Sequence, residues 1–156
     1  MDNSLITPAS DKTVPTSKPR LWSPNAAANW SLLFSPAFGA ILHAKNWIEL
    51  GEIDRARSNK NWARGVLIFL ATAVLIPSIP ILDRIIQVVG LVLILRWYFT
   101  QGRQQVTFVK EKYGQEYERK KWGQPILIGI GCLVGFLACS IIINMIYALL
   151  FGLTIE

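Results

Sequence analysis

The chain has 156 residues, of which 52% are hydrophobic and 17% are charged, and its formal net charge is +6 at pH 7. Soluble domains usually contain about 25% charged residues, whereas here uncharged runs extend over residues 65–82 and 125–155. Helices in these runs would be apolar on every side, which excludes an ordinary soluble domain and favours an all-α, polytopic membrane protein.

Residues 1–21 are predicted to form a disordered N-terminal tail. The first 20 residues contain three prolines and several Ser and Thr residues, but no apolar run. A cleavable signal peptide would need such a run, so we expect none here. Residues 22–156 are predicted to form a single helical membrane domain with four hydrophobic segments.

The first hydrophobic segment covers residues 26–44. As one helix it would be about 28 Å long, which is just enough to cross a bilayer. Pro36 would kink this helix, and Ser35 could satisfy the carbonyl that the proline leaves without a donor. We favour a full crossing, which places the N-terminus outside. A re-entrant or surface helix would place the N-terminus inside and is the alternative.

The same region carries a pattern that covers about 18 residues of the 156-residue chain, Phe34-x-Pro36-x-x-Gly39-x-x-Leu42-x-x-x-Asn46-Trp47-x-x-Leu50-Gly51. This pattern resembles an element of uncharacterised small bacterial inner-membrane proteins, in which it forms the first hydrophobic segment and the turn after it. The resemblance implies a bacterial inner membrane. It brings no catalytic residues with it.

Two further segments are predicted at about 62–79 and 81–99. A single helix over residues 65–99 would be about 52 Å long and would overshoot the hydrocarbon core of about 30 Å. Pro77 and Pro80 instead favour a tight turn between two helices. The sequence therefore predicts a helical hairpin with a short, exposed tip.

The stretch that follows the hairpin is predicted to be a cytoplasmic amphipathic helix. Its apolar residues recur at helical spacing, at Val106, Val109, Tyr113 and Tyr117. Its basic residues are candidate contacts for anionic lipids, and they are Lys110, Lys112, Arg119, Lys120 and Lys121. A surface helix that packs on the bundle is favoured over a binding face for a soluble partner.

The fourth segment, at about 126–153, carries two sets of residues that suit helix packing. Small residues recur every four positions at Gly131, Gly135 and Cys139, and would let another helix approach closely. Ser140 and Asn144 are also four apart and should seek polar partners on another helix. Packing within this chain is favoured over the seam of a homo-oligomer.

Tryptophans and basic residues predict the topology. All six tryptophans lie near predicted segment ends, where indole rings anchor at the headgroup level, and they are Trp22, Trp30, Trp47, Trp62, Trp97 and Trp122. The connections 45–64 and 96–121 hold five and seven Lys or Arg residues, while the hairpin tip holds only Arg84. Both connections are therefore predicted to be cytoplasmic and the C-terminus to be outside. The positive charge is read as a topology and lipid signal, and no nucleic acid is expected.

Few residues suit catalysis. The single histidine, His43, is interpreted as a hydrogen-bonded residue at the membrane interface rather than a ligand, and no carboxylate cluster accompanies it to make a metal site. Cys132 and Cys139 lie about 10 Å apart along one helix and cannot pair with each other. A role of Asp83 in ion transfer is less favoured than a position in water at the hairpin tip. We expect no enzyme, no metal and no cofactor.

Three classes of function remain open. The favoured class is a protein that binds another membrane protein, for which the layout is similar to immunity proteins against membrane-inserting toxins. This likeness rests on size, several spans and short loops rather than on a motif. A small oligomeric channel or transporter is the second class, and an accessory subunit of a membrane complex is the third.

Overall fold

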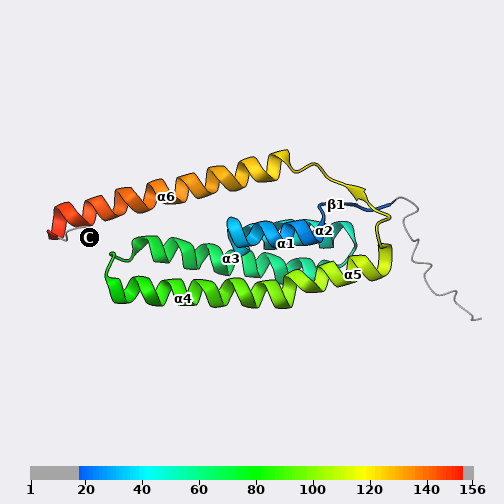
Figure 1. The fold of residues 1–156 in the computed structure, drawn as a ribbon, viewed down its shortest axis with the longest axis horizontal. Helices are drawn as coiled ribbons and strands as arrows, with labels where there is room; N and C mark the ends of the chain where they lie inside the picture. The colour runs from blue at the N-terminus through cyan, green and yellow to red at the C-terminus, as the bar shows by residue number, and fades with distance from the viewer. Residues whose placement is uncertain (1–17, 153–156) are drawn as a thin grey trace, which may run out of the picture.

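The computed structural model describes residues 18–152, and helices make up most of this part of the chain (Figure 1). A short parallel pairing of β1 (Arg20–Leu21) with β2 (Glu118–Arg119) joins the start of the described chain to the segment before the last helix. The predicted tail, residues 1–21, lies outside the described residues except for residues 18–21.

Two short helices, α1 (Pro24–Leu33) and α2 (Pro36–Glu49), stand in place of the single helix predicted over residues 26–44. The break falls at Ser35, whose Oγ accepts a hydrogen bond from the Phe38 backbone N–H at 3.3 Å and so caps α2. Pro36 then begins α2, where its missing N–H costs nothing. Helices of 10 and 14 residues are only about 15 and 21 Å long, so the predicted full crossing by this segment is wrong.

The predicted hairpin consists of α3 (Ile53–Leu75) and α4 (Pro80–Trp97), which lie side by side (Figure 1). The chain turns between them at residues 76–79, and Pro80 is the first residue of α4, as the two prolines predict. However, α3 begins nine residues before the predicted boundary at residue 62, so its first half is charged. The uncharged part of α3, residues 65–75, is only about 16 Å long.

A five-residue π-helix, η1 (Tyr98–Gly102), continues α4 into α5 (Arg103–Tyr113). The predicted amphipathic helix corresponds to α5, but α5 ends at Tyr113 and does not continue to Tyr117 as predicted. It is followed by Gly114, whose φ of +57° is a backbone conformation that favours glycine. Lys110 and Lys112 belong to α5, whereas Arg119 lies in β2.

The last helix, α6 (Gly123–Phe151), runs beside the hairpin and ends near the hairpin turn (Figure 1). One side of α6 faces the rest of the chain, with a close contact near each end of the helix. Near its start, the ring of Phe34 lies against Gly129, where an added Cβ would be 3.0 Å from the ring. Near its end, the Tyr147 hydroxyl donates a hydrogen bond to the Leu75 carbonyl at 2.7 Å.

Within residues 18–152, α6 alone is long and apolar enough to cross a membrane. The predicted polytopic transmembrane bundle of four segments is therefore wrong. The first segment is broken into two short helices, and α3 is charged through its first half. In α4, the charges of Asp83, Arg84 and Arg96 fall within 18 residues.

A buried network of polar side chains holds together the end of the molecule that contains α1, α2 and α5. The Asn46 side chain accepts a hydrogen bond from the Trp22 backbone N–H at 3.1 Å and donates to the Trp22 carbonyl at 2.8 Å. It also donates to Gln105 Oε1 at 3.1 Å, and Gln105 Nε2 in turn donates to the His43 carbonyl at 2.9 Å. Asn46 and Gln105 are fully buried, so these bonds tie the N-terminal segment and α5 to α2.

The core of this end is built around Trp97, which is fully buried against α2. Gly39 makes this contact possible, because an added Cβ would lie 2.5 Å from Trp97 Cη2 and 2.6 Å from the Ser31 Cβ. Gly39, Asn46 and Trp47 all belong to the sequence pattern at residues 34–51, and each is buried or in close contact inside the protein. In this chain, these residues of the pattern therefore pack the protein core.

Candidate functional site

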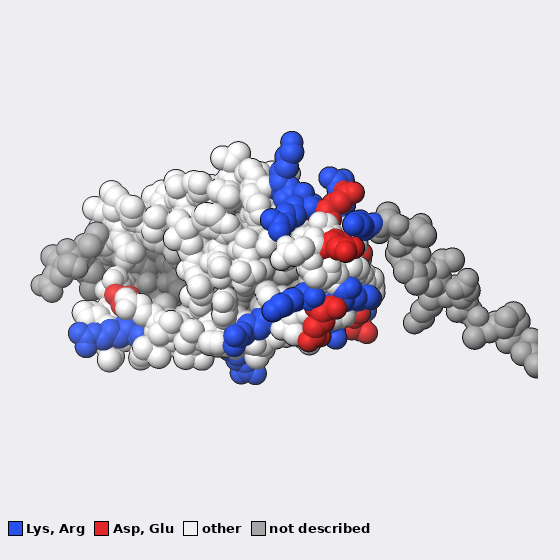
Figure 2. Space-filling model, turned by 45° about the vertical axis from the view of Figure 1, so that its right-hand side comes forward, with Lys and Arg blue, Asp and Glu red and all other residues white. Residues whose placement is uncertain are grey.

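The molecule is divided into a charged end and an uncharged half (Figure 2). Lys, Arg, Asp and Glu gather over the end that contains α5, β2 and the start of α3, whereas the other half is uncharged except for one small group. That group is Asp83 and Arg84 at the hairpin tip, the only charges among residues 65–95. The uncharged half consists of α6 and the outer part of the hairpin.

A cleft of about 260 Å³ lies in this uncharged half, between the hairpin and α6. Most of its walls are apolar, but five polar side chains also line it, and these are Ser78, Asp83, Gln87, Ser140 and Asn144. The predicted pair on α6 therefore meets polar residues of the hairpin. Nothing in the sequence indicated that the hairpin and α6 would place these residues in one cleft.

The hydrogen bonds of these side chains are mostly local. Ser78 Oγ donates to Asp83 Oδ2 at 2.7 Å across the hairpin turn. On α6, Ser140 Oγ donates to the Phe136 carbonyl and Asn144 Nδ2 to the Ser140 carbonyl, both at 2.9 Å. Amide and carboxylate oxygens that face the cleft can accept further hydrogen bonds. The cleft can therefore accept hydrogen bonds from a polar group that enters it.

The small residues of α6 lie on a different side of the helix from this cleft. Gly131 and Gly135 are exposed, and no atom lies within 4 Å of where their Cβ would be. At 3.6 residues per turn, Gly135 and Ser140 are about 140° apart around the helix. The residues predicted to form one packing face therefore lie on two different faces of α6. Gly131, Gly135 and Cys139 form one of them, called the small-residue stripe below. This stripe is not used for packing within residues 18–152.

The six tryptophans divide into two groups. Trp47 and Trp97 are fully buried in the protein core, so for these two the prediction of headgroup anchors is wrong. The other four are partly exposed, and they are Trp22, Trp30, Trp62 and Trp122. Spacing alone could not separate the groups, because both kinds of tryptophan lie near segment ends.

The five basic residues predicted to contact anionic lipids also fall into two groups. Lys110, Lys112, Arg119 and Lys121 are exposed. Lys120 is instead engaged inside the protein, because its Nζ lies 3.3 Å from Glu49 Oε2 and 4.7 Å from the centre of the Trp22 ring. Lys120 therefore helps to hold β2 against the N-terminal segment.

His43 is fully buried rather than interfacial, so the predicted position is wrong. Burial lowers its pKa to about 4, and a hydrogen bond between Nε2 and the Pro24 carbonyl, 3.2 Å away, opposes this shift. The ring is therefore neutral at pH 7 and donates from Nε2. Among the described residues, no group of three or more His, Cys, Asp or Glu side chains is placed to hold a metal ion.

Sequence reasoning missed the buried network. Asn46 gave a usable signal, because it is a polar residue on the same helical face as His43 within an apolar segment. Gln105 gave none, since it lies in a polar stretch where a surface position is the ordinary expectation.

Comparisons of the chain with protein-family models, with curated proteins and with solved structures find no match.

Proposed function

We propose that α6 crosses a lipid bilayer and that the uncharged part of the hairpin lies in the same apolar layer. The observation that carries this proposal is the exposure of α6. Its most apolar stretch has a mean hydropathy of 2.8, yet only 6% of that stretch is buried. A core helix of a soluble protein would be mostly buried. Exposed apolar side chains of the hairpin, such as Ile68, Ile81 and Val88, extend the same surface.

The charged end then lies at one membrane surface. Its excess of Lys and Arg favours the cytoplasmic side of a bacterial inner membrane, and a crossing by α6 then places the C-terminus outside. This orientation follows the positive-inside rule.

Within the membrane, we propose that the protein acts without catalysis, by lateral contact with another membrane protein. Helices associate in lipid through close packing at small residues and a few polar contacts. The small-residue stripe and the cleft at Ser140 and Asn144 offer both kinds of contact, on two sides of α6. A membrane-inserting toxin is the partner class that this part of the proposal favours, and the protein would then be an immunity protein.

The native cysteines provide a direct test of the membrane position. Cys132 and Cys139 are unpaired, exposed and carried by α6. A water-soluble maleimide should leave both unlabelled in intact membranes and label both after denaturation. As a matched control, Gln115→Cys in a chain that also carries Cys132→Ala and Cys139→Ala should react without denaturation. Equal reactivity of the native cysteines and the control in intact membranes would overturn the proposal.

A second experiment tests the lateral contact. Gly135→Leu should leave thermal stability unchanged, because the site faces open space. It should abolish protection of the membrane potential in cells that co-express a toxin encoded beside the protein. Ile141→Ala is the control, since Ile141 is exposed about 120° away around α6. If deletion of the protein leaves cells equally resistant to every neighbouring effector, the immunity hypothesis fails.

A further inference from the structure

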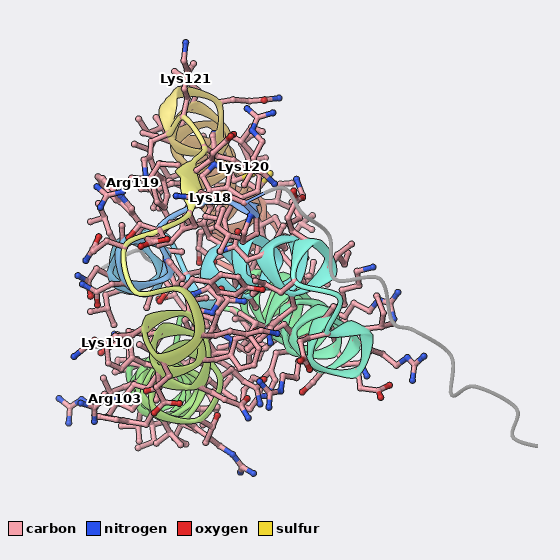
Figure 3. The ribbon with its side chains drawn as sticks, turned by 90° about the vertical axis from the view of Figure 1, so that its right-hand side faces the viewer. Lys18, Arg103, Lys110, Arg119, Lys120 and Lys121 are labelled. Carbon is pink, nitrogen blue, oxygen red and sulfur yellow. The ribbon has the colours of Figure 1, made fainter. Side chains whose placement is uncertain are left out.

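A second cleft lies at the charged end, between α1 and the segment formed by η1 and α5. Its volume is about 570 Å³, within the range of ligand sites. On α5, Arg103, Thr107 and Lys110 line it together, because residues four and seven apart share one face of a helix. Figure 3 shows Arg103 and Lys110 on the same side of α5, away from Lys120 and Lys121.

The two cations in this cleft have no carboxylate at ion-pair distance within residues 18–152. Two other cations of the charged end differ in this respect, since Arg20 is paired with Glu118 and Lys120 with Glu49. Glu111 also lines the cleft, so the lining carries two positive charges and one negative charge. The cleft therefore favours a ligand with a net negative charge.

The donors in the cleft suit a phosphate group. A guanidinium can bind two phosphate oxygens at once, and an ammonium binds as a point charge. Tyr98 and Thr107 add hydroxyl groups, and Asn25 adds an amide. The Arg103 guanidinium also lies 5.6 Å from the centre of the Phe99 ring, close enough for a weak cation–π attraction.

The position of the cleft identifies the source of the phosphate. Val92, Leu95 and Phe99 are exposed apolar residues eleven, eight and four positions before Arg103. An acyl chain on this surface would bring its headgroup to Arg103. The π-helix lies at the same junction, and such insertions are frequent at functional sites.

We infer that this cleft binds the phosphate of an anionic phospholipid headgroup at the boundary between the uncharged half and the charged end. This inference rests on the proposed membrane position of α6. It adds a lipid-specific site to that position, which a membrane-spanning helix does not require.

The test compares phosphatidylglycerol with phosphatidylcholine. The full chain in detergent is titrated with each lipid, and thermal unfolding is recorded. Phosphatidylglycerol should raise the midpoint, and phosphatidylcholine should not. The double variant Arg103→Gln, Lys110→Gln should lose at least tenfold in apparent affinity. The matched double variant Arg119→Gln, Lys121→Gln makes the same change in charge outside the cleft and should keep the wild-type response.

Two further arms separate the possible outcomes. Glycerol 3-phosphate and inorganic phosphate should give no comparable shift, and an equal shift would assign the site to a soluble phosphate and overturn the lipid. Thr107→Val keeps every charge and should still weaken the response, so a loss caused by misfolding of the double variant would be recognised. An equal loss in both double variants would reduce the effect to general surface charge and overturn the inference.

Cysteine labelling of the same preparations in nanodiscs distinguishes the two proposals. If Cys132 and Cys139 are protected while the response does not distinguish the two lipids, the headgroup site alone fails. If both cysteines react freely, the membrane position fails.

Discussion

Replacement of Gly39 by alanine should destabilise the protein, although alanine is the better helix former. Glycine within a helix costs about 1 kcal/mol relative to alanine, so Gly39→Ala gains that amount from the backbone. The added Cβ, however, would lie 2.5 Å from Trp97 Cη2 and 2.6 Å from the Ser31 Cβ. Carbon atoms in contact are ordinarily about 3.5–4.0 Å apart, so the methyl group intrudes by about 1 Å on two sides.

Neither neighbour can move away cheaply. Trp97 and Ser31 are both fully buried, and overpacking of a well-packed core costs about 1–3 kcal/mol or more. At the upper end of that range, the net loss after the gain in helix propensity is about 2 kcal/mol. For a chain of this size, that loss lowers the unfolding midpoint by roughly 4–8 °C.

The assay is thermal unfolding of the full chain in detergent, with Gly65→Ala as the matched control. Gly65 also lies within a helix, but no atom lies within 4 Å of where its Cβ would be. The control should therefore be as stable as the wild type or slightly more stable. Trp97→Phe should relieve part of the effect of Gly39→Ala in the double variant. If Gly39→Ala matched Gly65→Ala, the close contact with Trp97 would be refuted.

Two other predictions use the same assay. Asn46→Leu leaves the buried Trp22 backbone groups and Gln105 without a partner, so it should cost about 3 kcal/mol; wild-type stability would contradict the network. For His43, the folded pKa of about 4 lies below the unfolded value of 6.5, so the unfolded chain binds more protons between these values. Stability should fall by about 3 kcal/mol as the pH falls from 6.5 to 4, and His43→Gln should lack this part of the slope.

Helix boundaries were predictable where proline or an uncharged run marked them. Pro80 begins α4, and α6 begins within three residues of its predicted start at residue 126. The first segment failed for a reason that is visible only in three dimensions. Pro36 within a helix can either kink it or end it, and here the Ser35 cap and the close contact at Gly39 make two packed helices the stable arrangement.

The site was less predictable than the helices. Ser140 and Asn144 were identified by their type and spacing, but the residues that face them come from the hairpin. Sequence spacing within one helix contains no information about how that helix is turned toward another element. The same limit explains the small-residue stripe, whose spacing is right for close packing although no part of residues 18–152 packs against it.

The two ends of the molecule are stabilised in different ways, and this difference bears on the proposed function. At the charged end, Trp97, Asn46 and Gln105 are fully buried, so the protein supplies its own core and its own polar partners. In the uncharged half, only 6% of the most apolar stretch of α6 is buried. Its contacts with the rest of the chain run along one side, from Gly129 through the cleft at Ser140 to Tyr147. The side of α6 that faces away from the hairpin gains nothing from packing within residues 18–152. In the proposed position, a bilayer would cover this side without specific contacts and would leave it available to another membrane helix.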